Sequence, residues 1–454
     1  MNIAVAGAGF VGIVHAAVMA RQGNKVILFD VNEQRVQDLI AFCEGKTDAL
    51  PIHEAGLPES LRQMHKENLL FFTTDARKAI QQSTIIFIAV GTPPDAEGKA
   101  DLKYVDAIAH ECGKVLKEQR SYKIIVNKST VPVGTAKRVE AIIKQWYDGA
   151  FDVVSNPETL AEGTAVRDAW RPNRIIVGAR SERAKKIFQD IYAPFFSPQQ
   201  EKIFFMSPES AELTKYACNT YLASQVVLTN IFANVAKRTG ANWREMIPAI
   251  LGDERIGKFV YPGLGFGGSC FRKDVSQLYN TIKEQGFQDM DATVLQKILE
   301  QNESQKLQLN KVLETVYPEL PGLTLAVWGL SFKKDTNDIR DAASLVVIPE
   351  LVRRGVKIRA HDPQAGEEYI NELRKMQQDV SKIHLCKEKY ETLDGADGLL
   401  ILNDWKTYRQ PDLAELRKRL KQKIIFDGKD ILNYTELIEA ADIAYYSIGR
   451  PDIQ

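Results

Sequence analysis

A glycine-rich stretch that ends in a cysteine holds the residues best suited to covalent chemistry. Residues 263–268 contain four glycines in six positions, and such a segment lets backbone approach a ligand where side chains would collide. Cys270 follows, with Arg272, Lys273 and Asp274 within one helical turn of it. Neighbouring cations favour the thiolate, which is the form of cysteine that attacks carbonyl carbon. A glycine turn with an incidental, hydrophobic cysteine is the competing interpretation.

Two polar residues on a long predicted helix are the second candidate for chemistry. The helix is expected from residue 207 to residue 238, with Ser207 as its N-cap and Pro208 at its first position. Lys215 and Asn219 are four residues apart and share one face, and apolar neighbours indicate that this face is buried. The lysine either extends its amine to solvent or places it for catalysis.

The N-terminal residues predict the element that positions a cofactor. An apolar strand (residues 2–6) leads into the glycine pattern of residues 7–12, a helix to about residue 22 and a strand that ends at Asp30. This order is typical of dinucleotide-binding folds, whose glycines admit a pyrophosphate to the helix N-terminus. A carboxylate at Asp30 can accept hydrogen bonds from a ribose and would repel a 2′-phosphate, which favours NAD over NADP. An ordinary glycine turn is the alternative.

Further strands continue this pattern with helices between most of them. They are expected at residues 69–73, 84–90, 123–127, 152–155 and 174–177, which is the rhythm of a parallel, doubly wound sheet. Ligands bind at the carboxyl ends of such strands, so we expect Thr130, Glu158 and Glu162 in the following loops to face a cleft. Ordinary helix-start chemistry explains any single one of these loops equally well.

The C-terminal third predicts a second, smaller α/β domain. Helices are expected at residues 243–251 and 275–317, and a break at 318–322 precedes new strands at residues 323–330, 356–361, 382–385, 398–402 and 423–426, with helices at 344–353 and 365–376. Its first strand has no glycine fingerprint and leads into the charged residues 331–340, so this domain should bind something other than NAD, unless the loop is only a solvated surface. We therefore predict two Rossmann-like doubly wound domains joined by a long central helix and a helical region, with boundaries at 1–206, 207–317 and 318–454.

The bulk composition excludes several classes of protein. The chain has 454 residues, 44% of them hydrophobic and 26% charged, as in ordinary globular proteins. A formal net charge of zero gives no reason to expect nucleic-acid or membrane binding, and neither a leader peptide nor a spanning segment is evident. Five dispersed cysteines argue against a disulfide framework or a metal site. We expect a cytoplasmic protein in a reducing compartment, with no metal.

Over nearly its whole length the chain resembles the UDP-glucose/GDP-mannose dehydrogenase family. The motifs that carry the resemblance are GAGFVG (7–12), VGTPP (90–94), KSTVPVG (128–134), NPE (156–158), EG (162–163), ELTK (212–215) with Asn219, GFGGSCF (265–271) and FKKDT (332–336). Ser269 before the cysteine favours the branches that act on UDP-glucose or GDP-mannose rather than on N-acetyl sugars. Phe271 favours UDP-glucose as the substrate.

The resemblance implies a four-electron oxidation of the sugar C6 alcohol to a carboxylate with two NAD per turnover. Cys270 would form a thiohemiacetal and then a thioester, Lys215 with Asp274 and water would assist proton removal, and Glu158 with Thr130 would direct hydrolysis. The implied catalytic residues are Cys270, Lys215, Asn219, Asp274, Glu158 and Thr130. The implied cofactor contacts are Gly7, Gly9, Phe10, Val11, Gly12, Asp30, Arg35, Thr92, Thr130, Glu162, Lys273 and Arg340. The implied substrate contacts are Glu158, Lys215, Asn219, Arg255, Phe259, Gly263, Phe266, Gly267, Lys333 and Lys429.

The resemblance also implies a homodimer or higher homo-oligomer, because the family residue matching Arg255 reaches the sugar from a partner subunit. The chain departs from the family pattern at four places. Thr159 replaces a phenylalanine, Arg272 replaces a proline, Lys429 replaces an arginine, and the segment at Arg255 is about one residue short. A lysine lacks the guanidinium fork, so Lys429 should alter the affinity for substrate.

Three other functions compete with this one. A two-electron dehydrogenase of the β-hydroxyacid type also pairs a Rossmann domain with a Lys-x-x-x-Asn helix, but it has no use for Cys270 and would yield one NADH per substrate. A non-enzymatic sensor of nucleotide sugars would bind without turnover. GDP-mannose is the alternative substrate within the family, since no linear motif determines which base is bound.

Overall fold

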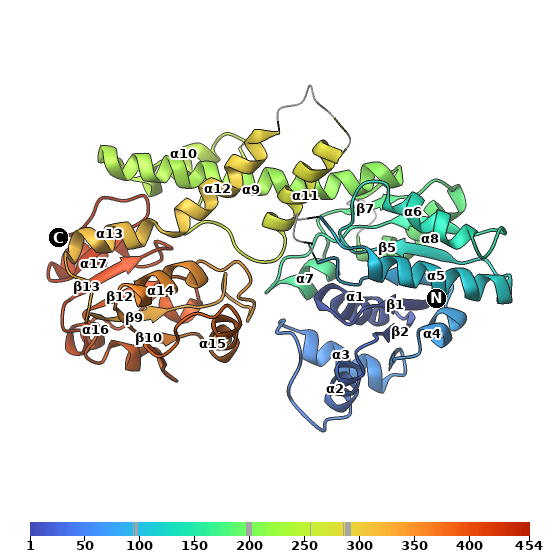
Figure 1. Cartoon of the computed structure of the whole chain (residues 1–454), viewed down its shortest axis with the longest axis horizontal. Coiled ribbons are helices and arrows are strands. Elements are labelled where there is room, and N and C mark those ends of the chain that lie inside the picture. The colour runs from blue at the N-terminus through green and yellow to red at the C-terminus, as the bar shows by residue number, and fades with distance from the viewer. Residues whose placement is uncertain (94, 96–98, 197–201, 255, 285, 287–291) are drawn as a thin grey trace. The chain divides into compact units, whose positions relative to one another are not determined.

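The chain divides into two compact units (Figure 1). The computed structural model describes residues 1–454 apart from 94, 96–98, 197–201, 255, 285 and 287–291. The first unit comprises Met1–Cys218 and Asn280–Phe287, and the second comprises Asn219–Tyr279 and Gln288–Gln454. The helices α9 (Pro208–Thr239) and α11 (Phe271–Glu284) have residues in both units.

The first unit is built on an eight-stranded sheet of order β3-β2-β1-β4-β5-β6-β7-β8. Its strands are β1 (Asn2–Ala6), β2 (Lys25–Phe29), β3 (Leu70–Thr73), β4 (Ile85–Ile88), β5 (Ile124–Asn127), β6 (Asp152–Ser155), β7 (Ile175–Gly178) and β8 (Ile203–Met206). Its helices are α1 (Phe10–Arg21), α2 (Glu33–Cys43), α3 (Leu57–Lys66), α4 (Ala76–Gln82), α5 (Lys103–Gln119), α6 (Thr135–Lys144), α7 (Ala165–Trp170) and α8 (Glu182–Tyr192), with a short 3₁₀ turn at Ala193–Phe195. The central strands β4 and β5 are buried throughout, as expected of a sheet covered on both faces.

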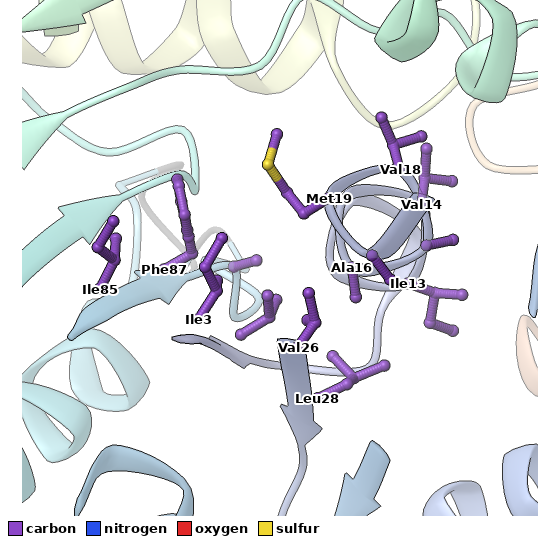
Figure 2. Close-up of a cluster of buried hydrophobic side chains, with 14 of the residues drawn as sticks. Ile3, Ile13, Val14, Ala16, Val18, Met19, Val26, Leu28, Ile85 and Phe87 are labelled. Carbon is purple, nitrogen blue, oxygen red and sulfur yellow. The ribbon is translucent and has the colours of Figure 1, made fainter. Parts of the chain in front are cut away.

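Alternate residues of the central strands supply two separate cores. In β1, Ile3 and Val5 point to one core while Ala4 and Ala6 point to the other, because successive side chains leave a strand on opposite faces. Figure 2 shows the first core, in which α1 side chains such as Val18 and Met19 gather with strand residues such as Phe87. The doubly wound architecture predicted from the sequence is confirmed.

One strand pair differs from the predicted parallel sheet. β6 and β7 are antiparallel and pair at Ser155 and Gly178, while β7 and β8 are parallel to each other. The prediction was wrong here because a hydrophobic run reports that a strand is buried but not its direction. The edge strand β8 was also missed, and its burial is only partial.

The second unit has a six-stranded sheet of order β11-β10-β9-β12-β13-β14, in which every pair is parallel. Its strands are β9 (Thr324–Trp328), β10 (Lys357–His361), β11 (Ile383–Leu385), β12 (Gly398–Ile401), β13 (Ile424–Asp427) and β14 (Ala444–Ser447). Its other helices are α10 (Trp243–Leu251), α12 (Thr293–Lys306), α13 (Gln308–Val316), α14 (Ser344–Arg353), α15 (Gly366–Lys375), α16 (Leu413–Arg419) and α17 (Tyr434–Ala440), with 3₁₀ turns at Lys389–Leu393 and Lys406–Tyr408. This sheet confirms the second predicted α/β domain, to which it adds β14.

The helical region predicted at residues 275–317 consists of separate helices α11, α12 and α13, and α11 begins earlier than expected, at Phe271. Within the described part of the chain, no helix is long and apolar enough to cross a membrane.

Candidate active site

The loop between β1 and α1 is shaped to receive a diphosphate. Gly7 has a φ of +103°, and a Cβ there would lie 2.7 Å from Ala89 O, so glycine is required for the turn itself. Gly9, the N-cap of α1, makes no side-chain cap, and a Cβ on it would meet no described atom within 4 Å. The space beside Gly9 and the N–H groups of the first helical turn together fit an anionic ligand. Phe10 and Val11 begin this turn and are half-buried.

Asp30 follows β2 and holds the same loop. Its Oδ2 accepts a hydrogen bond from Ala8 N at 2.6 Å, and its Oδ1 accepts one from Asn32 N at 2.8 Å. A carboxylate has about four lone-pair sites, so it retains capacity for a ribose hydroxyl. The loop, the helix terminus and this carboxylate fit NAD. Arg35 lies in the first turn of α2 and donates its backbone N–H to the N-cap Asn32.

The loops after β4 and β5 are tied to each other and to α9. Thr92 is buried and donates its hydroxyl to Thr130 O at 2.9 Å. Glu212 of α9 accepts hydrogen bonds from Gly134 N at 2.6 Å and Ala136 N at 2.9 Å. The Thr130 loop is therefore held at both of its ends by buried polar contacts.

Glu158 and Lys215 form a buried ion pair in the first unit. Lys215 Nζ lies 2.7 Å from Glu158 Oε1, and Leu160 N donates to Glu158 Oε2 at 2.6 Å. Burial alone would raise the pKa of Glu158, but Lys215, the Leu160 N–H and the charge of Lys128 bring it below its ordinary value. The carboxylate is ionised at neutral pH and can act as a base.

Asn219 pairs with Asp274 in the second unit. Its Nδ2 donates to Asp274 Oδ2 at 2.5 Å, and both side chains are buried. The burial expected for the Lys215 and Asn219 face is therefore confirmed. Each of the two residues has its own carboxylate partner, which helical spacing could not indicate.

Cys270 immediately precedes α11 and is exposed. Asp274 N donates to Cys270 O at 2.9 Å, so the thiol stands at the start of the helix, where the positive end of the helix dipole favours a thiolate. Its Sγ is 3.6 Å from Ser269 Oγ. The sequence-based helix start near residue 275 concealed this feature. Lys273 is half-buried in the first turn of α11.

Three buried amides hold the glycine loop, and sequence reasoning missed all of them. Asn230 Oδ1 accepts from Gly263 N at 2.8 Å, and Gln305 Nε2 donates to Gly263 O at 2.8 Å. Asn302 accepts from Phe266 N at 2.7 Å and donates to Phe266 O at 3.0 Å. The available signal was the presence of amides on otherwise core-facing positions of α9 and α12.

The other side of the cysteine loop packs on the charged loop after β9. Gly268 N donates to Arg340 O at 2.7 Å, and a Cβ on Gly267 would lie 2.6 Å from Asp341 O. Lys333 Nζ lies 5.4 Å from the centroid of the Phe332 ring, and Arg340 pairs with Asp338. Predicted substrate and cofactor contacts are thus carried by one loop, which abuts the cysteine loop.

Lys429 lies beside the start of the glycine loop. A Cβ on Gly263 would be 3.4 Å from Lys429 Cδ. Burial lowers the pKa of Lys429, while the charges of Asp404 and Asp427 oppose the shift. Two residues predicted to contact substrate, Lys429 and Gly263, therefore lie together.

The remaining predicted residues are more peripheral. Phe259 is exposed and its carbonyl accepts from Thr229 Oγ1 at 2.7 Å. Glu162 is half-buried in the loop before α7. Arg255 lies outside the described residues.

Comparisons with known proteins agree with this geometry. Three family models match the chain: the UDP-glucose/GDP-mannose dehydrogenase family NAD binding domain at residues 1–196, its central domain at 209–304 and its UDP binding domain at 326–434. The chain is 38% identical to UDP-glucose 6-dehydrogenase TuaD of Bacillus subtilis, covering 100% of this chain and 94% of that one. It is 37% identical to UDP-glucose 6-dehydrogenase of Pseudomonas aeruginosa, covering 99% and 98%.

A solved structure extends the likeness to three dimensions. The UDP-glucose dehydrogenase from the hyperthermophilic archaeon Pyrobaculum islandicum aligns with a TM-score of 0.87 at 32% identity, covering 99% of this chain and 97% of that one. The cofactor loop, the glycine loop and the second sheet all lie within matched regions. The chain belongs to the UDP-glucose/GDP-mannose dehydrogenase family.

Proposed function

We propose that the chain is an NAD-dependent UDP-glucose 6-dehydrogenase, which oxidises UDP-glucose to UDP-glucuronate. The observation that carries this proposal is Cys270 at the N-terminus of α11, directly after a glycine loop in a chain with an NAD-binding sheet. Conversion of an alcohol to a carboxylate needs a nucleophile that keeps the intermediate aldehyde in a form able to lose a second hydride. The names of the relatives favour UDP-glucose over GDP-mannose.

The cofactor is held by the loop of Gly7, Gly9 and Gly12, by Phe10 and Val11 in the first turn of α1, and by Asp30. NAD, when bound, accepts a hydride from C6 in each of two oxidations. The proposed outer contacts are Arg35, Thr92, Thr130, Glu162, Lys273 and Arg340.

In the first oxidation, Lys215 and Asp274 assist removal of the C6 hydroxyl proton as the hydride leaves carbon. Lys215 and Asn219 then stabilise the negative charge that develops on oxygen. The buried ion pair of Lys215 with Glu158, at 2.7 Å, supports this role because the pair holds the amine within the protein rather than in solvent.

Cys270 next adds its sulfur to the aldehyde carbon, and the carbonyl oxygen takes a proton to give a thiohemiacetal. Loss of a hydride and the hydroxyl proton from this adduct gives a thioester. The helix terminus at Phe271 supports the attacking thiolate.

Hydrolysis of the thioester completes the reaction. Glu158, with Thr130 and a water molecule, removes a proton as the water oxygen bonds to the carbonyl carbon; the C–S bond then breaks and Cys270 leaves as thiolate. The lowered pKa of Glu158 supports this assignment because the base is ionised at neutral pH.

In this proposal the second unit supplies most of the contacts to the sugar nucleotide, through the glycine loop, Asn219, Lys333 and Lys429. The first unit contributes Glu158 and Lys215, and a partner subunit contributes Arg255. The loop contributions come from Phe259, Gly263, Phe266 and Gly267. The match of the UDP binding domain at 326–434 supports this location. We also propose the division into domains at 1–206, 207–317 and 318–454.

The chain is proposed to be a cytoplasmic homodimer or higher homo-oligomer. An apolar stripe on α9 supports association, since Tyr221, Leu228, Phe232 and Val235 repeat at helical spacing and each is more than half exposed. Light scattering of the purified protein should give at least twice the mass of one chain, which is 51.0 kDa.

The decisive test measures NADH produced per mole of limiting sugar nucleotide, with UDP-glucose and GDP-mannose assayed side by side. We expect two NADH from UDP-glucose alone. A yield of one NADH would favour a two-electron dehydrogenase, and product from GDP-mannose alone would reassign the substrate.

A cysteine variant tests the proposed intermediate. Cys270→Ser should lose full turnover while NAD still binds, whereas Cys386→Ser, a half-buried thiol in the second unit, should keep full activity. Unchanged turnover in Cys270→Ser would contradict the thiohemiacetal.

A further inference from the structure

A small, partly open cavity lies in the first unit, beside the loop that carries Glu158. Its volume is about 40 Å³, and its walls include Val18 and Met19 of α1, whose apolar side chains appear in Figure 2. The remaining walls mix apolar residues such as Leu160 and Ile175 with the polar residues His15, Lys128 and Asn156. A single buried water needs a cavity volume of about 10–15 Å³ and two to four polar partners, so this cavity has room for water.

His15 supplies an unsatisfied polar atom on the cavity wall. It is 5% exposed, and its Nε2 has no hydrogen-bond partner among the described residues. Burial, followed by the charge of Lys128, lowers the pKa of His15 well below its usual value, so the ring is neutral. Its ring packs edge-on against Phe87 with centroids 4.3 Å apart, which fixes its orientation. An unpaired buried nitrogen is unfavourable, and water in the cavity would satisfy it.

Lys128 supplies a donor on the same wall. It directly follows β5, and its Nζ donates to Asn156 Oδ1 at 3.1 Å. That oxygen also accepts from Tyr192 OH at 2.5 Å, and Asn156 Nδ2 donates to Ile176 O at 2.7 Å, so Asn156 is rigidly placed. Burial, together with the charge of Lys215 and against that of Glu158, lowers the pKa of Lys128 to about 8. Both its ammonium and its amine are accessible near neutral pH.

The environment of Lys128 differs from that of Lys123, a second buried lysine at the opposite end of β5. Lys123 precedes β5, and its Nζ donates to three carbonyls: Ile80 O at 2.9 Å, Gln81 O at 3.3 Å and Ser83 O at 2.6 Å. An ammonium has three donors, so these bonds use all of them. Lys123 is structural, whereas Lys128 faces a polar cavity and has the charges of Glu158 and Lys215 close to it.

The reaction proposed above creates a need for such a group. Hydrolysis of a thioester by one water yields the carboxylate, the Cys270 thiolate and two protons. Glu158 is almost completely buried, so the proton that it collects must pass to another group before the next turnover. If Lys128 and Lys215 were both charged beside the single carboxylate of Glu158, these buried groups would also carry a net positive charge, which is unfavourable.

We propose that the cavity is a water-binding site and that Lys128 passes protons between Glu158 and the cavity water, which is hydrogen-bonded to His15 Nε2. The proposal rests on the proposed function. During hydrolysis the attacking water gives one proton to Glu158, and the neutral amine of Lys128 takes that proton to become ammonium. Lys128 then gives it to the cavity water, which passes it to bulk solvent, and Lys128 returns to amine. The second proton leaves on the carboxylic acid product, which ionises in solvent. The groups that face Lys128 or its cavity are His15, Glu158, Asp168, Arg174, Tyr192 and Lys215.

Replacement of the amine by an isosteric apolar group is the direct test. In Lys128→Met, steady-state hydrolysis of the thioester should slow by about 100-fold, the lower range for general acid–base catalysis. The first burst of NADH should persist, and intact-mass analysis of quenched enzyme should show a sugar nucleotide adduct on Cys270. Lys128→Arg, which keeps the charge but cannot release a proton, should fold and show the same defect.

The matched control is Lys123→Met, which should lower thermal stability without accumulation of the adduct or a change in the pH profile. Equal adduct levels in Lys128→Met and the parent enzyme, with an unchanged pH profile, would overturn the relay. A high-resolution experimental structure should show water within hydrogen-bond distance of His15 Nε2, and a dry cavity would overturn the water site.

One readout needs no substrate and separates this proposal from the proposed function. Because the pKa of Lys128 falls from 10.5 to about 8 in the fold, the unfolded chain binds more protons between these values. Stability should therefore gain from rising pH across that window, and Lys128→Met should lose this contribution. If the parent protein is inactive on UDP-glucose but Lys128→Met still loses this pH-dependent stability, the assigned substrate is refuted and the titration of Lys128 is supported. If Lys128→Met keeps the pH-dependent stability, the role of Lys128 is overturned.

Discussion

The two sheets share one topology around their first strands, but the connection that follows the first strand differs between them. In the first unit, β1 ends at Ala6 and α1 begins at Phe10, so a short glycine loop meets a helix terminus. In the second unit, β9 ends at Trp328 and α14 begins only at Ser344. The longer connection carries Lys333 and Arg340 and packs against the cysteine loop.

The carboxylates after the second strands show the same contrast. Asp30 after β2 accepts two backbone hydrogen bonds. Asp362 after β10 accepts from Leu330 N at 2.7 Å, Ser331 N at 3.1 Å and Trp405 Nε1 at 3.3 Å, and its Oδ1 accepts from Gln364 N and Ala365 N, both at 2.9 Å. Asp362 is saturated by the fold, while Asp30 retains acceptor sites. A carboxylate at the same topological position can therefore serve either a ligand or the loop itself.

Gly329, after β9, and Gly9, in the loop after β1, should respond in opposite ways to a methyl group, and the largest effect is expected at Gly329. This residue has a φ of +98°, and a Cβ would lie 2.2 Å from Asn403 Cβ. Gly329→Ala should destabilise the second unit by about 3 kcal/mol or more. Denaturation followed by tryptophan fluorescence, to which Trp328 and Trp405 of this unit contribute, measures the loss.

Gly23→Ala is the matched control for this prediction. Gly23 also has a positive φ, +80°, but a Cβ there would meet no described atom within 4 Å. This control should cost only about 1 kcal/mol for the strained backbone. Equal losses in the two variants would contradict the clash at Asn403.

At Gly9 the same methyl group should affect the ligand and not the fold. The backbone is extended there, with a φ of −83°, and a Cβ would point into open space. Gly9→Ala should weaken NAD binding by about 100-fold, or about 2.7 kcal/mol, because the methyl occupies space that the pyrophosphate needs. Calorimetric titration with NAD measures the effect, and the unfolding temperature without NAD should not change. Unaltered affinity would mean that the diphosphate lies elsewhere.

Those glycines illustrate what the sequence can indicate and what it cannot. The order of strand, fingerprint, helix and acid predicted the NAD loop, and buried hydrophobic runs predicted helices such as Trp243–Leu251 and Ser344–Arg353 with their observed bounds. These features arise from residues close together in the chain, where periodicity and capping are legible. A methyl clash with Asn403 depends on a residue far away in sequence and could not be predicted.

The parts of the site that sequence reasoning missed are of the same long-range kind. Asn302 supports the glycine loop from another helix, and His15 and Lys128 face one cavity from different elements. The direction of β7 likewise depends on its connection rather than its composition. The residues able to do chemistry could be identified from the sequence, but the residues that they contact could be identified only from the fold.

Asp30 and Asp362 should also differ in what is lost when each carboxylate is replaced by a neutral amide. Asp30→Asn should weaken NAD binding by about tenfold, or about 1.4 kcal/mol, and should relieve the repulsion of a 2′-phosphate. Asp362→Asn should leave NAD affinity unchanged and destabilise the second unit by about 1–3 kcal/mol, because buried donors lose a partner. Binding isotherms for NAD and NADP, with unfolding curves for both variants, test this pair. Weakened NAD binding in Asp362→Asn would break the distinction.

The smallest expected effects are opposite pH slopes from two buried carboxylates at strand ends. The pKa of Glu158 in the first unit is below its ordinary 4.5, because Lys215 and its other partners outweigh burial. The unfolded chain then binds more protons, so the stability contributed by Glu158 is present above pH 4.5 and is lost as the pH falls below it.

For Asp427 in the second unit, burial and the charge of Asp430 raise the pKa above 3.8. The native state then binds more protons, so this contribution falls as the pH rises above 3.8. Each slope is limited to about 1.4 kcal/mol per pH unit, since one proton is involved. Unfolding curves between about pH 3 and 6 should lose the positive slope in Glu158→Gln and the negative slope in Asp427→Asn; slopes of the same sign would show that both sites stabilise the same charge state.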